Sequence, residues 1–153
     1  MTSARGERHR PARLLFALYR SARPAQLIVA NRTVAKATQL AAHFSGLVRP
    51  HHEVAAVGYD GLGGEFDIVI NATSAGLTGD LPPLPDGVFA PGALAYDMVY
   101  GKATPFLGFA AQRGARAVDG LGMLVEQAAE SFFIWRGVRP STAPVIRALR
   151  QKA

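Results

Sequence analysis

The chain has 153 residues, of which 49% are hydrophobic and 18% are charged, a composition typical of one globular domain and unlike that of disordered, collagen-like or coiled-coil proteins. The lack of cysteine excludes disulfides, Cys-zinc sites and thiol catalysis. The longest apolar run, near residues 14–19, is far shorter than the roughly 18–20 residues of a membrane-spanning helix, so we expect no membrane partner.

The net charge of +6 comes mainly from the N-terminus. Six arginines precede residue 26 and only Glu7 opposes them, which leaves 11 basic and 10 acidic residues for the rest of the chain. An organelle transit peptide and a nucleic-acid-binding arm are alternatives to a solvated tail, but the stretch lacks the interleaved aromatic residues and basic stripe of a nucleic-acid surface. We expect residues 1–13 to form an atypical basic arm before a domain over residues 14–153, and no nucleic-acid partner.

Along this domain, short apolar runs alternate with helical patterns. The run 27–30 and the polar residues 31–33 predict a strand and a turn, followed by a helix that Thr33 caps and Gly46 ends. A helix is also predicted over 104–113, and further strands are predicted over 54–57, 66–70, 94–97 and 115–118. Apolar strands that alternate with helices are typical of a parallel α/β sheet.

The strongest helical pattern follows Asp119 and ends at Gly137, and a second helix begins near Pro144. Gly120, Met123 and Gln127 lie on one face of the first helix, where they are candidates for contact with a ligand. The apolar positions predict a different, inward face made of Leu121, Leu124, Val125, Ala128, Ala129, Phe132 and Phe133.

The first strand and turn carry a candidate cofactor residue. In a doubly wound sheet the residue just past the second strand meets the adenosine ribose, and an arginine there accommodates the 2′-phosphate of NADP. Arg32 holds that place if the run 27–30 is the second strand, and a charge-assisted hydrogen bond of about 1.5–3 kcal/mol would give a roughly ten- to hundredfold preference for NADP. The alternative is an ordinary exposed arginine.

Two later strand ends carry further candidates. Residues 71–76 leave the strand 66–70 at the edge where open α/β sheets bind ligands, and their small side chains permit close approach of a ribose or nicotinamide. Asp97 and Tyr100 follow the next strand, where substrate would enter. A polar turn and a solvated strand end are the respective alternatives.

Two other patterns are less specific. Gly120-Leu121-Gly122 matches only the start of a dinucleotide fingerprint, because Val125 stands where the third glycine would be. We expect no metal site at His51-His52-Glu53, because adjacent imidazoles rarely point at one ion.

Taken together, the motifs resemble shikimate dehydrogenase, an NADP-dependent family that interconverts 3-dehydroshikimate and shikimate in aromatic amino-acid biosynthesis. The resemblance runs from about Leu14 to the C-terminus and is carried by residues 31–33, 70–76, 96–100, 120–127 and 133–135. It implies a cytoplasmic oxidoreductase with a Rossmann-like, doubly wound parallel sheet, and leaves the oligomeric state open.

The resemblance also implies roles for single residues. Arg32 and Thr33 would hold the 2′-phosphate, and Met123 would contact the nicotinamide. Tyr100 and Gln127 would reach the carboxylate or hydroxyl side of shikimate or 3-dehydroshikimate. The cofactor residues implied in full are Asn31, Arg32, Thr33, Asn71, Thr73, Ser74, Gly120 and Met123.

The sequence departs from the family at its N-terminal side. The family's substrate domain, with its catalytic Lys and Asp pair, and its Gly-Ala-Gly-Gly-Ala loop are not found, so we expect a sheet incomplete at its N-terminal strand and no catalytic residue in this chain. One hypothesis for the Arg-rich stretch before Leu14 is a shifted reading frame or a mis-called start of the gene, and a genuine N-terminal arm is the alternative. A non-catalytic NADP-binding or domain-complementing module, and a quinate/shikimate dehydrogenase relative, are the alternative functions.

Overall fold

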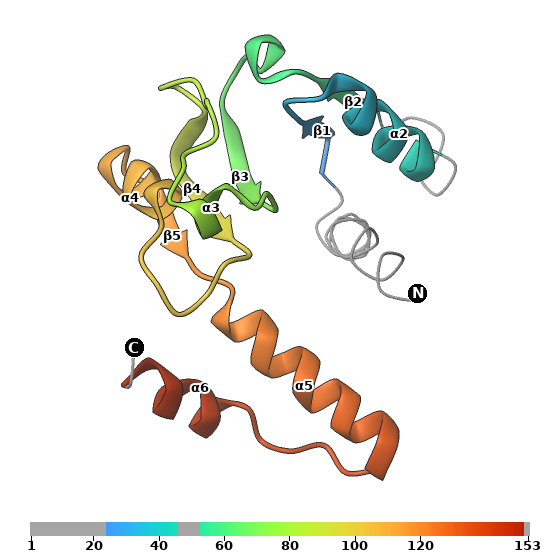
Figure 1. The fold of residues 1–153 in the computed structure, drawn as a ribbon, viewed down its shortest axis with the longest axis vertical. Coiled ribbons are helices and arrows are strands. Elements are labelled where there is room, and N and C mark those ends of the chain that lie inside the picture. The colour runs from blue at the N-terminus through green and yellow to red at the C-terminus, as the bar shows by residue number, and fades with distance from the viewer. Residues whose placement is uncertain (1–23, 46–52, 152–153) are drawn as a thin grey trace. The chain divides into compact units, whose positions relative to one another are not determined.

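The computed structural model describes residues 24–45 and 53–151 (Figure 1). The chain divides into two compact units, Met1–Gly63 and Gly64–Ala153, and each is described by itself. The predicted arm over residues 1–13, the helix-ending role of Gly46 and the pair His51-His52 lie outside the described residues.

The described residues of the first unit, 24–45 and 53–63, form a β-α-β element. Strand β1 (Gln26–Ala30) is followed by helix α2 (Val34–Ser45) and strand β2 (Glu53–Val57), and a short 3-10 turn, η2 (Tyr59–Gly61), comes after β2. The two strands are parallel, with Leu27 opposite Val54. Ala37 and Ala41 form the buried side of α2. The predicted order of strand, turn, helix and strand is confirmed.

The second unit contains a three-stranded parallel sheet in the order β3-β4-β5, which confirms the predicted Rossmann-like α/β class. Its elements are β3 (Phe66–Asn71), α3 (Ala75–Thr78), β4 (Phe89–Asp97), α4 (Pro105–Gln112), β5 (Arg116–Val118), α5 (Leu121–Arg136) and α6 (Ala143–Arg150). Within the described residues, no helix is long and apolar enough to cross a membrane.

Strand β4 is longer than the sequence predicts. It begins at Phe89, which pairs with Phe66 of β3, although a predicted strand starting at residue 94 left this part out. Pro91 and Gly92 break the apolar pattern, and Gly92 has a positive φ of 77°. The register shifts between Phe66 and Ile68, so the irregular start of β4 pairs through a bulge that local pattern does not indicate.

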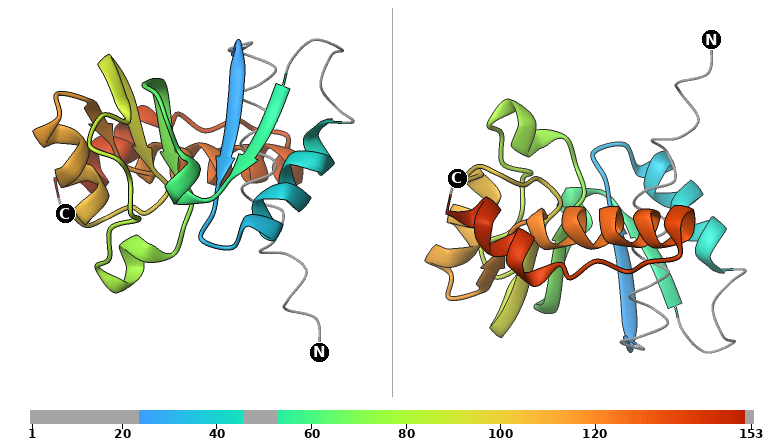
Figure 2. Two further views of the ribbon diagram at one scale, coloured as in Figure 1. Left: turned by 90° about the horizontal axis from the view of Figure 1, so that it is seen from above. Right: turned by 90° about the horizontal axis from the view of Figure 1, so that it is seen from below.

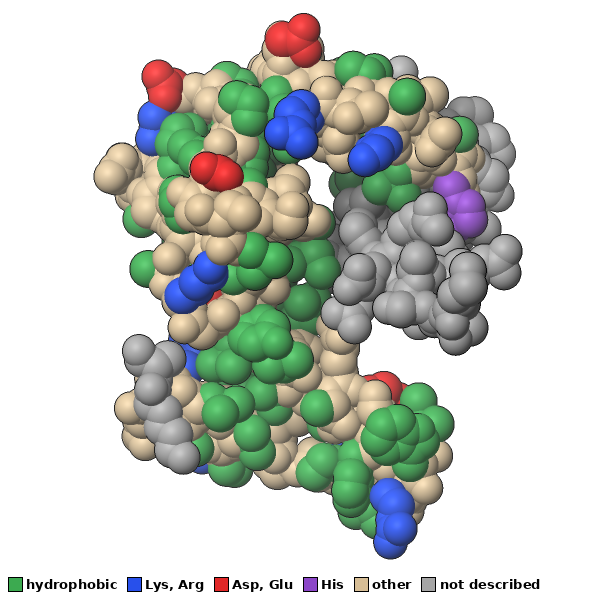
Figure 3. Space-filling view, in the orientation of Figure 1, with side chains coloured by type: hydrophobic (Ala, Val, Ile, Leu, Met, Phe, Trp, Pro, Cys, Tyr) green, Lys and Arg blue, Asp and Glu red, His purple; other side chains and the backbone are tan. Residues whose placement is uncertain are grey.

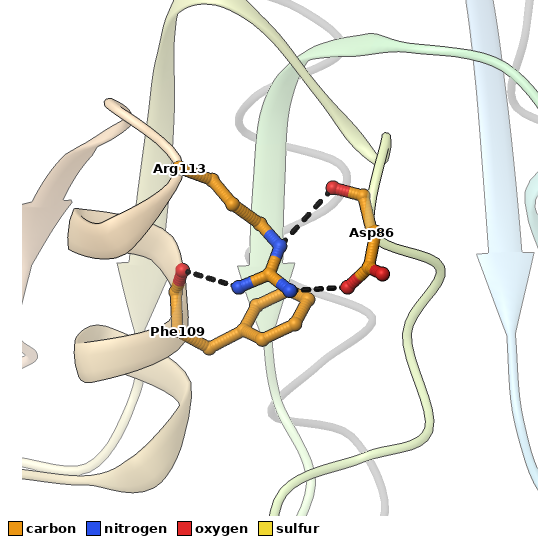
Figure 4. A network of polar contacts seen from close by, with 3 residues as sticks. All are labelled: Asp86, Phe109 and Arg113. Atoms are coloured by element: carbon orange, nitrogen blue, oxygen red, sulfur yellow. Dashed lines mark hydrogen bonds and ion pairs between the residues drawn. The ribbon is translucent and has the colours of Figure 1, made fainter.

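Helix α4 is fixed against the sheet by both apolar and polar contacts. Phe106 and Ala110 are buried, and the ring of Phe106 lies 6.3 Å from that of Phe89. The Arg113 guanidinium stacks on the Phe109 ring, with its central carbon 3.5 Å from the ring centroid (Figure 4). Arg113 also donates hydrogen bonds to the Asp86 backbone and carboxylate, which ties α4 to the loop before β4.

The prediction that seven apolar residues of α5 pack inward is wrong for most of them. Only Leu121, Val125 and Ala129 are buried, a stripe with four-residue spacing. Helix α6 runs back beside α5 (Figure 2), and apolar side chains remain visible over both helices (Figure 3). Ala128 is exposed, and so are the larger side chains of Leu124, Phe132 and Phe133, at 36%, 45% and 39%.

Candidate functional site

The carboxyl ends of β3, β4 and β5 lie at one edge of the sheet. The parallel register places Asn71 opposite Asp97 and Tyr96 opposite Val118. The segments that leave these strands therefore start side by side, which is where open α/β sheets bind ligands.

Asp97 is the centre of this edge. It is fully buried, at 0% exposure. Its Oδ1 accepts hydrogen bonds from the Val99 backbone N–H at 3.0 Å and from Asn71 Nδ2 at 3.4 Å, and its Oδ2 accepts one from Thr104 Oγ1 at 2.6 Å. A buried carboxylate needs such donors because leaving water is costly for a charge. The sequence predicts Asp97 at a strand end where substrate would enter, but its side chain is buried and both carboxylate oxygens accept hydrogen bonds from the protein.

The loop after β3 is organised around Asn71, which is also buried. Asn71 Oδ1 accepts hydrogen bonds from the Thr73 backbone N–H at 3.1 Å and from Thr73 Oγ1 at 2.8 Å. Thr73 Oγ1 in turn accepts one from the Ala75 backbone N–H at 3.2 Å, in the first turn of α3. Two predicted cofactor residues are thus joined, whereas Ser74 next to them is exposed.

Gly120, at the start of α5, allows two backbones to approach closely. A Cβ on Gly120 would stand 2.4 Å from the carbonyl oxygen of Met98, and the Gly120 N–H donates to the Val99 carbonyl at 3.0 Å. This packing explains the glycine independently of the predicted cofactor contact. Gly76 on α3 has less restricted surroundings, because its Cβ would lie 3.2 Å from a side-chain atom, Val99 Cγ2.

Tyr96 and Met123 meet beside this contact. Burial raises the pKa of the Tyr96 phenol above its ordinary value of 10.0, the Met123 backbone N–H lowers it by a hydrogen bond, and the nearby Asp119 carboxylate raises it. The neutral phenol is therefore the form present at neutral pH. Met123 is half-buried, so part of its side chain faces solvent.

An open pocket of about 410 Å³ lies between the loop after β4 and the two C-terminal helices. Tyr100 contributes to its wall, and the Asp119 carboxylate in the wall faces the Arg150 guanidinium at 3.5 Å. Gln127, the other predicted substrate residue, is exposed on α5 and is not part of the described lining. The remaining lining residues are Gly101, Leu121, Leu124 and Leu149.

Lys102 links the loop after β4 to α3. Its Nζ donates a hydrogen bond to the Leu77 carbonyl oxygen at 3.2 Å. Because Lys102 is itself exposed, the loop 100–104 presents one ammonium group near the surface of the second unit.

The first unit carries the other three predicted cofactor residues, in the turn after β1. Asn31 Oδ1 accepts a hydrogen bond from the Thr33 backbone N–H at 2.9 Å, and the Asn31 N–H donates to the Val57 carbonyl at 3.2 Å. Burial raises the pKa of the Tyr59 phenol above its ordinary value, and the positive charge of Arg32 opposes this rise in part. Arg32 and Thr33 are exposed and accessible to an anion.

Metal ligands are not grouped in the described part of the chain. Over residues 24–45 and 53–151, no three His, Asp or Glu side chains lie together as they would around an ion.

A family model, curated relatives and solved structures all relate this chain to shikimate dehydrogenases. The family model for the C-terminal domain of shikimate 5′-dehydrogenase matches residues 120–150. The shikimate dehydrogenase (NADP(+)) of Alkalilimnicola ehrlichii is 62% identical over 129 residues, which are 83% of this chain and 46% of that protein. The chain thus spans about half the length of the curated relatives that it matches.

Solved structures agree. An Ael1 enzyme from Pseudomonas putida is 53% identical with a TM-score of 0.72, over 82% of this chain and 46% of that one. A shikimate dehydrogenase solved in complex with NADP+ is 30% identical with a TM-score of 0.69, over 88% and 49% of the two chains. The resemblance to the shikimate dehydrogenase family that the motifs predict is confirmed, over about half the length of these relatives.

Proposed function

We propose that this chain is the NADP-binding part of a shikimate dehydrogenase, and that the whole enzyme interconverts 3-dehydroshikimate and shikimate. The observation that carries the proposal is the 62% identity to a curated NADP-dependent relative over 83% of this chain. NADP supplies the hydride when it is bound, and the protein supplies binding and orientation.

The exposed turn after β1 fits the adenosine end of NADP. Arg32 and Thr33 are both exposed, and the Asn31 side chain fixes the backbone between them. A guanidinium suits a phosphate because it can donate two parallel hydrogen bonds to it. In this proposal Arg32 and Thr33 bind the 2′-phosphate.

The edge of the second unit fits the nicotinamide and the substrate. The loop of Asn71, Thr73 and Ser74 would line the cofactor groove, and the half-buried Met123 would contact the nicotinamide. Tyr100, in the wall of the open pocket, would reach the substrate. Gln127 would act with it, and Gly120 would let the cofactor approach the start of α5.

A binding experiment tests the cofactor assignment. Calorimetry should show tighter binding of NADP+ than of NAD+, and Arg32→Ala should raise the Kd for NADP+ roughly ten- to hundredfold while leaving NAD+ unchanged, as expected for a lost charge-assisted hydrogen bond. Arg147→Ala, which removes an exposed arginine of α6, is the control for net charge and should change neither Kd. Equal loss of both cofactors in Arg32→Ala would contradict the role of its guanidinium.

A domain-complementing module is the second candidate, and it is favoured by the half-length coverage of the relatives. We expect the chain alone to oxidise shikimate poorly, since proton transfer by a positioned group contributes about 10²–10⁴-fold and orientation of substrate contributes more. Adding the separately expressed N-terminal half of a curated relative should restore NADP-coupled turnover. Turnover by the chain alone that Lys102→Ala abolishes would instead make Lys102 the proton-transfer group.

A further inference from the structure

The Asn71 amide is held at both ends, at its oxygen by the Thr73 backbone N–H and at its nitrogen by the Asp97 carboxylate. A carboxylate only accepts hydrogen bonds, so the amide must turn its donor, Nδ2, toward Asp97 Oδ1. The amide oxygen then faces the opposite way, toward Thr73. With both residues buried, neither end of the amide can exchange this arrangement for water.

The orientation of the Asn71 amide also fixes the hydrogen bonds of the loop that follows it. Thr73 gives both its backbone N–H and its hydroxyl proton to the Asn71 amide oxygen. Because the hydroxyl proton is used there, the lone pairs of Thr73 Oγ1 are left to accept the Ala75 N–H. Three consecutive bonds thus run in one direction, from the first turn of α3 through Thr73 and Asn71 to Asp97.

We propose that Asp97 is a positioning residue for cofactor binding, which holds the loop from Asn71 to Ala75 in the one conformation that receives NADP. This inference rests on the proposed function, in which Asn71 and Thr73 line the cofactor groove. Asp97 is itself enclosed, so it acts through Asn71 and not by touching the cofactor.

The same carboxylate offers a matched control on its other oxygen. Asp97 Oδ2 accepts from Thr104 Oγ1, which also accepts the Leu107 N–H as the N-cap of α4. Thr104→Val removes a hydrogen bond to Asp97 and a helix cap, but it leaves the Asn71 bond in place. A purely structural role of Asp97 predicts that variants of both residues behave alike.

The first measurement uses the full chain without cofactor. Amide hydrogen exchange by NMR should show the Thr73 and Ala75 N–H groups exchanging at least tenfold faster in Asp97→Ala. In Asp97→Asn, which keeps an acceptor oxygen for Asn71, their rates should stay within about threefold of wild type. Thr104→Val should accelerate exchange at Leu107 and leave Thr73 and Ala75 unchanged. Equal loop exchange in Asp97→Ala and wild type overturns the proposal.

The second measurement is the Kd for NADP+ at a temperature where every variant is folded. Asp97→Ala should raise it at least tenfold, whereas Asp97→Asn and Thr104→Val should stay within about threefold. If Thr104→Val raises the Kd as much as Asp97→Ala does, the effect is general destabilisation and the positioning role is wrong. If wild type binds no NADP+, the proposed function fails and the cofactor part of this inference fails with it, while the exchange data still decide whether Asp97 orders the loop.

If Asp97→Ala does not fold, a second pair of variants tests whether Asp97 orders the loop through Asn71. Asn71→Asp sets an acceptor against the Asp97 carboxylate and should accelerate exchange at Thr73 at least tenfold. Asn31→Asp makes the same change in the turn after β1, where Asn31 Oδ1 likewise accepts the N–H of the threonine two residues later, and should leave exchange at Thr33 within about threefold of wild type. Equal acceleration at Thr73 and Thr33 overturns the proposal.

Discussion

Gly120→Ala should destabilise the protein, because Gly120 is the N-cap of α5 and its backbone packs against a carbonyl oxygen. The added Cβ would stand 2.4 Å from the Met98 carbonyl oxygen, and real Cβ atoms essentially never come closer than 3.0 Å, so the two backbones must separate by at least about 0.6 Å. Such overpacking costs about 1–3 kcal/mol, and the smaller entropy of the unfolded alanine chain offsets about 0.4–1 kcal/mol of it. We expect a net loss of about 1–2 kcal/mol.

Thermal unfolding followed by circular dichroism measures this loss. For a chain of this size about 1 kcal/mol moves the Tm by roughly 2–4 °C, so Gly120→Ala should melt about 2–8 °C lower than wild type. Gly122→Ala is the matched control, because it adds the same methyl group two residues later in α5, where nothing lies within 4 Å of the new Cβ. It should melt at or above the wild-type Tm, since glycine inside a helix is worse than alanine by about 0.5–1 kcal/mol. Equal melting of the two variants would refute the close approach of Gly120 to Met98.

Two further predictions concern single side chains. In urea unfolding, Arg113→Ala should lower the free energy of unfolding by about 1–2 kcal/mol, because it removes the stacking on Phe109 and the hydrogen bonds to Asp86. Asp86→Ala should lower it by under about 0.5 kcal/mol, since the carboxylate is 90% exposed and the backbone acceptor of residue 86 stays. A larger loss in Asp86→Ala than in Arg113→Ala would contradict this order. The raised pKa of Tyr59 means that its phenol ionises more readily in the unfolded chain, so it stabilises the fold below pH 10.0 and this contribution is lost as pH rises through the folded-state pKa. The free energy of unfolding should therefore fall less between about pH 9 and 12 in Tyr59→Phe than in wild type. If it falls equally in both proteins, the ionisation of Tyr59 does not contribute to the loss of stability at high pH.

Much of the fold was predictable because the local pattern of apolar and polar residues indicates most of its strands and helices. Apolar runs of four or five residues followed by polar turns located β1, β2, β3 and β5, and the helical spacing located α4, α5 and α6. The start of β4 was not predictable in this way, because Pro91 and Gly92 interrupt its pattern and only pairing with Phe66 extends the strand to Phe89. The exposure of Phe132 and Phe133 was also missed, because a helical pattern shows which residues share a face and not what packs against it.

Some features of the candidate site were also predictable from the sequence and others were not. The positions of Asn71 and Thr73 at a strand end followed from the sequence, since the carboxyl ends of parallel strands form the ligand-binding edge. The burial of Asp97 did not, because a carboxylate at the end of an apolar run is usually solvated and only the convergence of three donors keeps it inside. Gly120 was assigned to the cofactor from its motif, but it is in contact with Met98, which directly follows β4 and lies more than twenty positions earlier in the chain.

The two Asn-x-Thr turns separate what local sequence determines from what the fold adds. In both turns the asparagine Oδ1 accepts the N–H of the threonine two residues later, at 2.9 Å after β1 and 3.1 Å after β3. Asparagine side chains commonly accept a hydrogen bond from the backbone N–H two residues on, so the local sequence favours this bond in both turns. The surroundings differ, because Asn71 is buried against a carboxylate while Asn31 is half-buried beside the exposed Arg32. One turn is therefore hydrogen-bonded into the sheet edge and the other presents an exposed cation, and the proposed binding of NADP uses each of them in a different way.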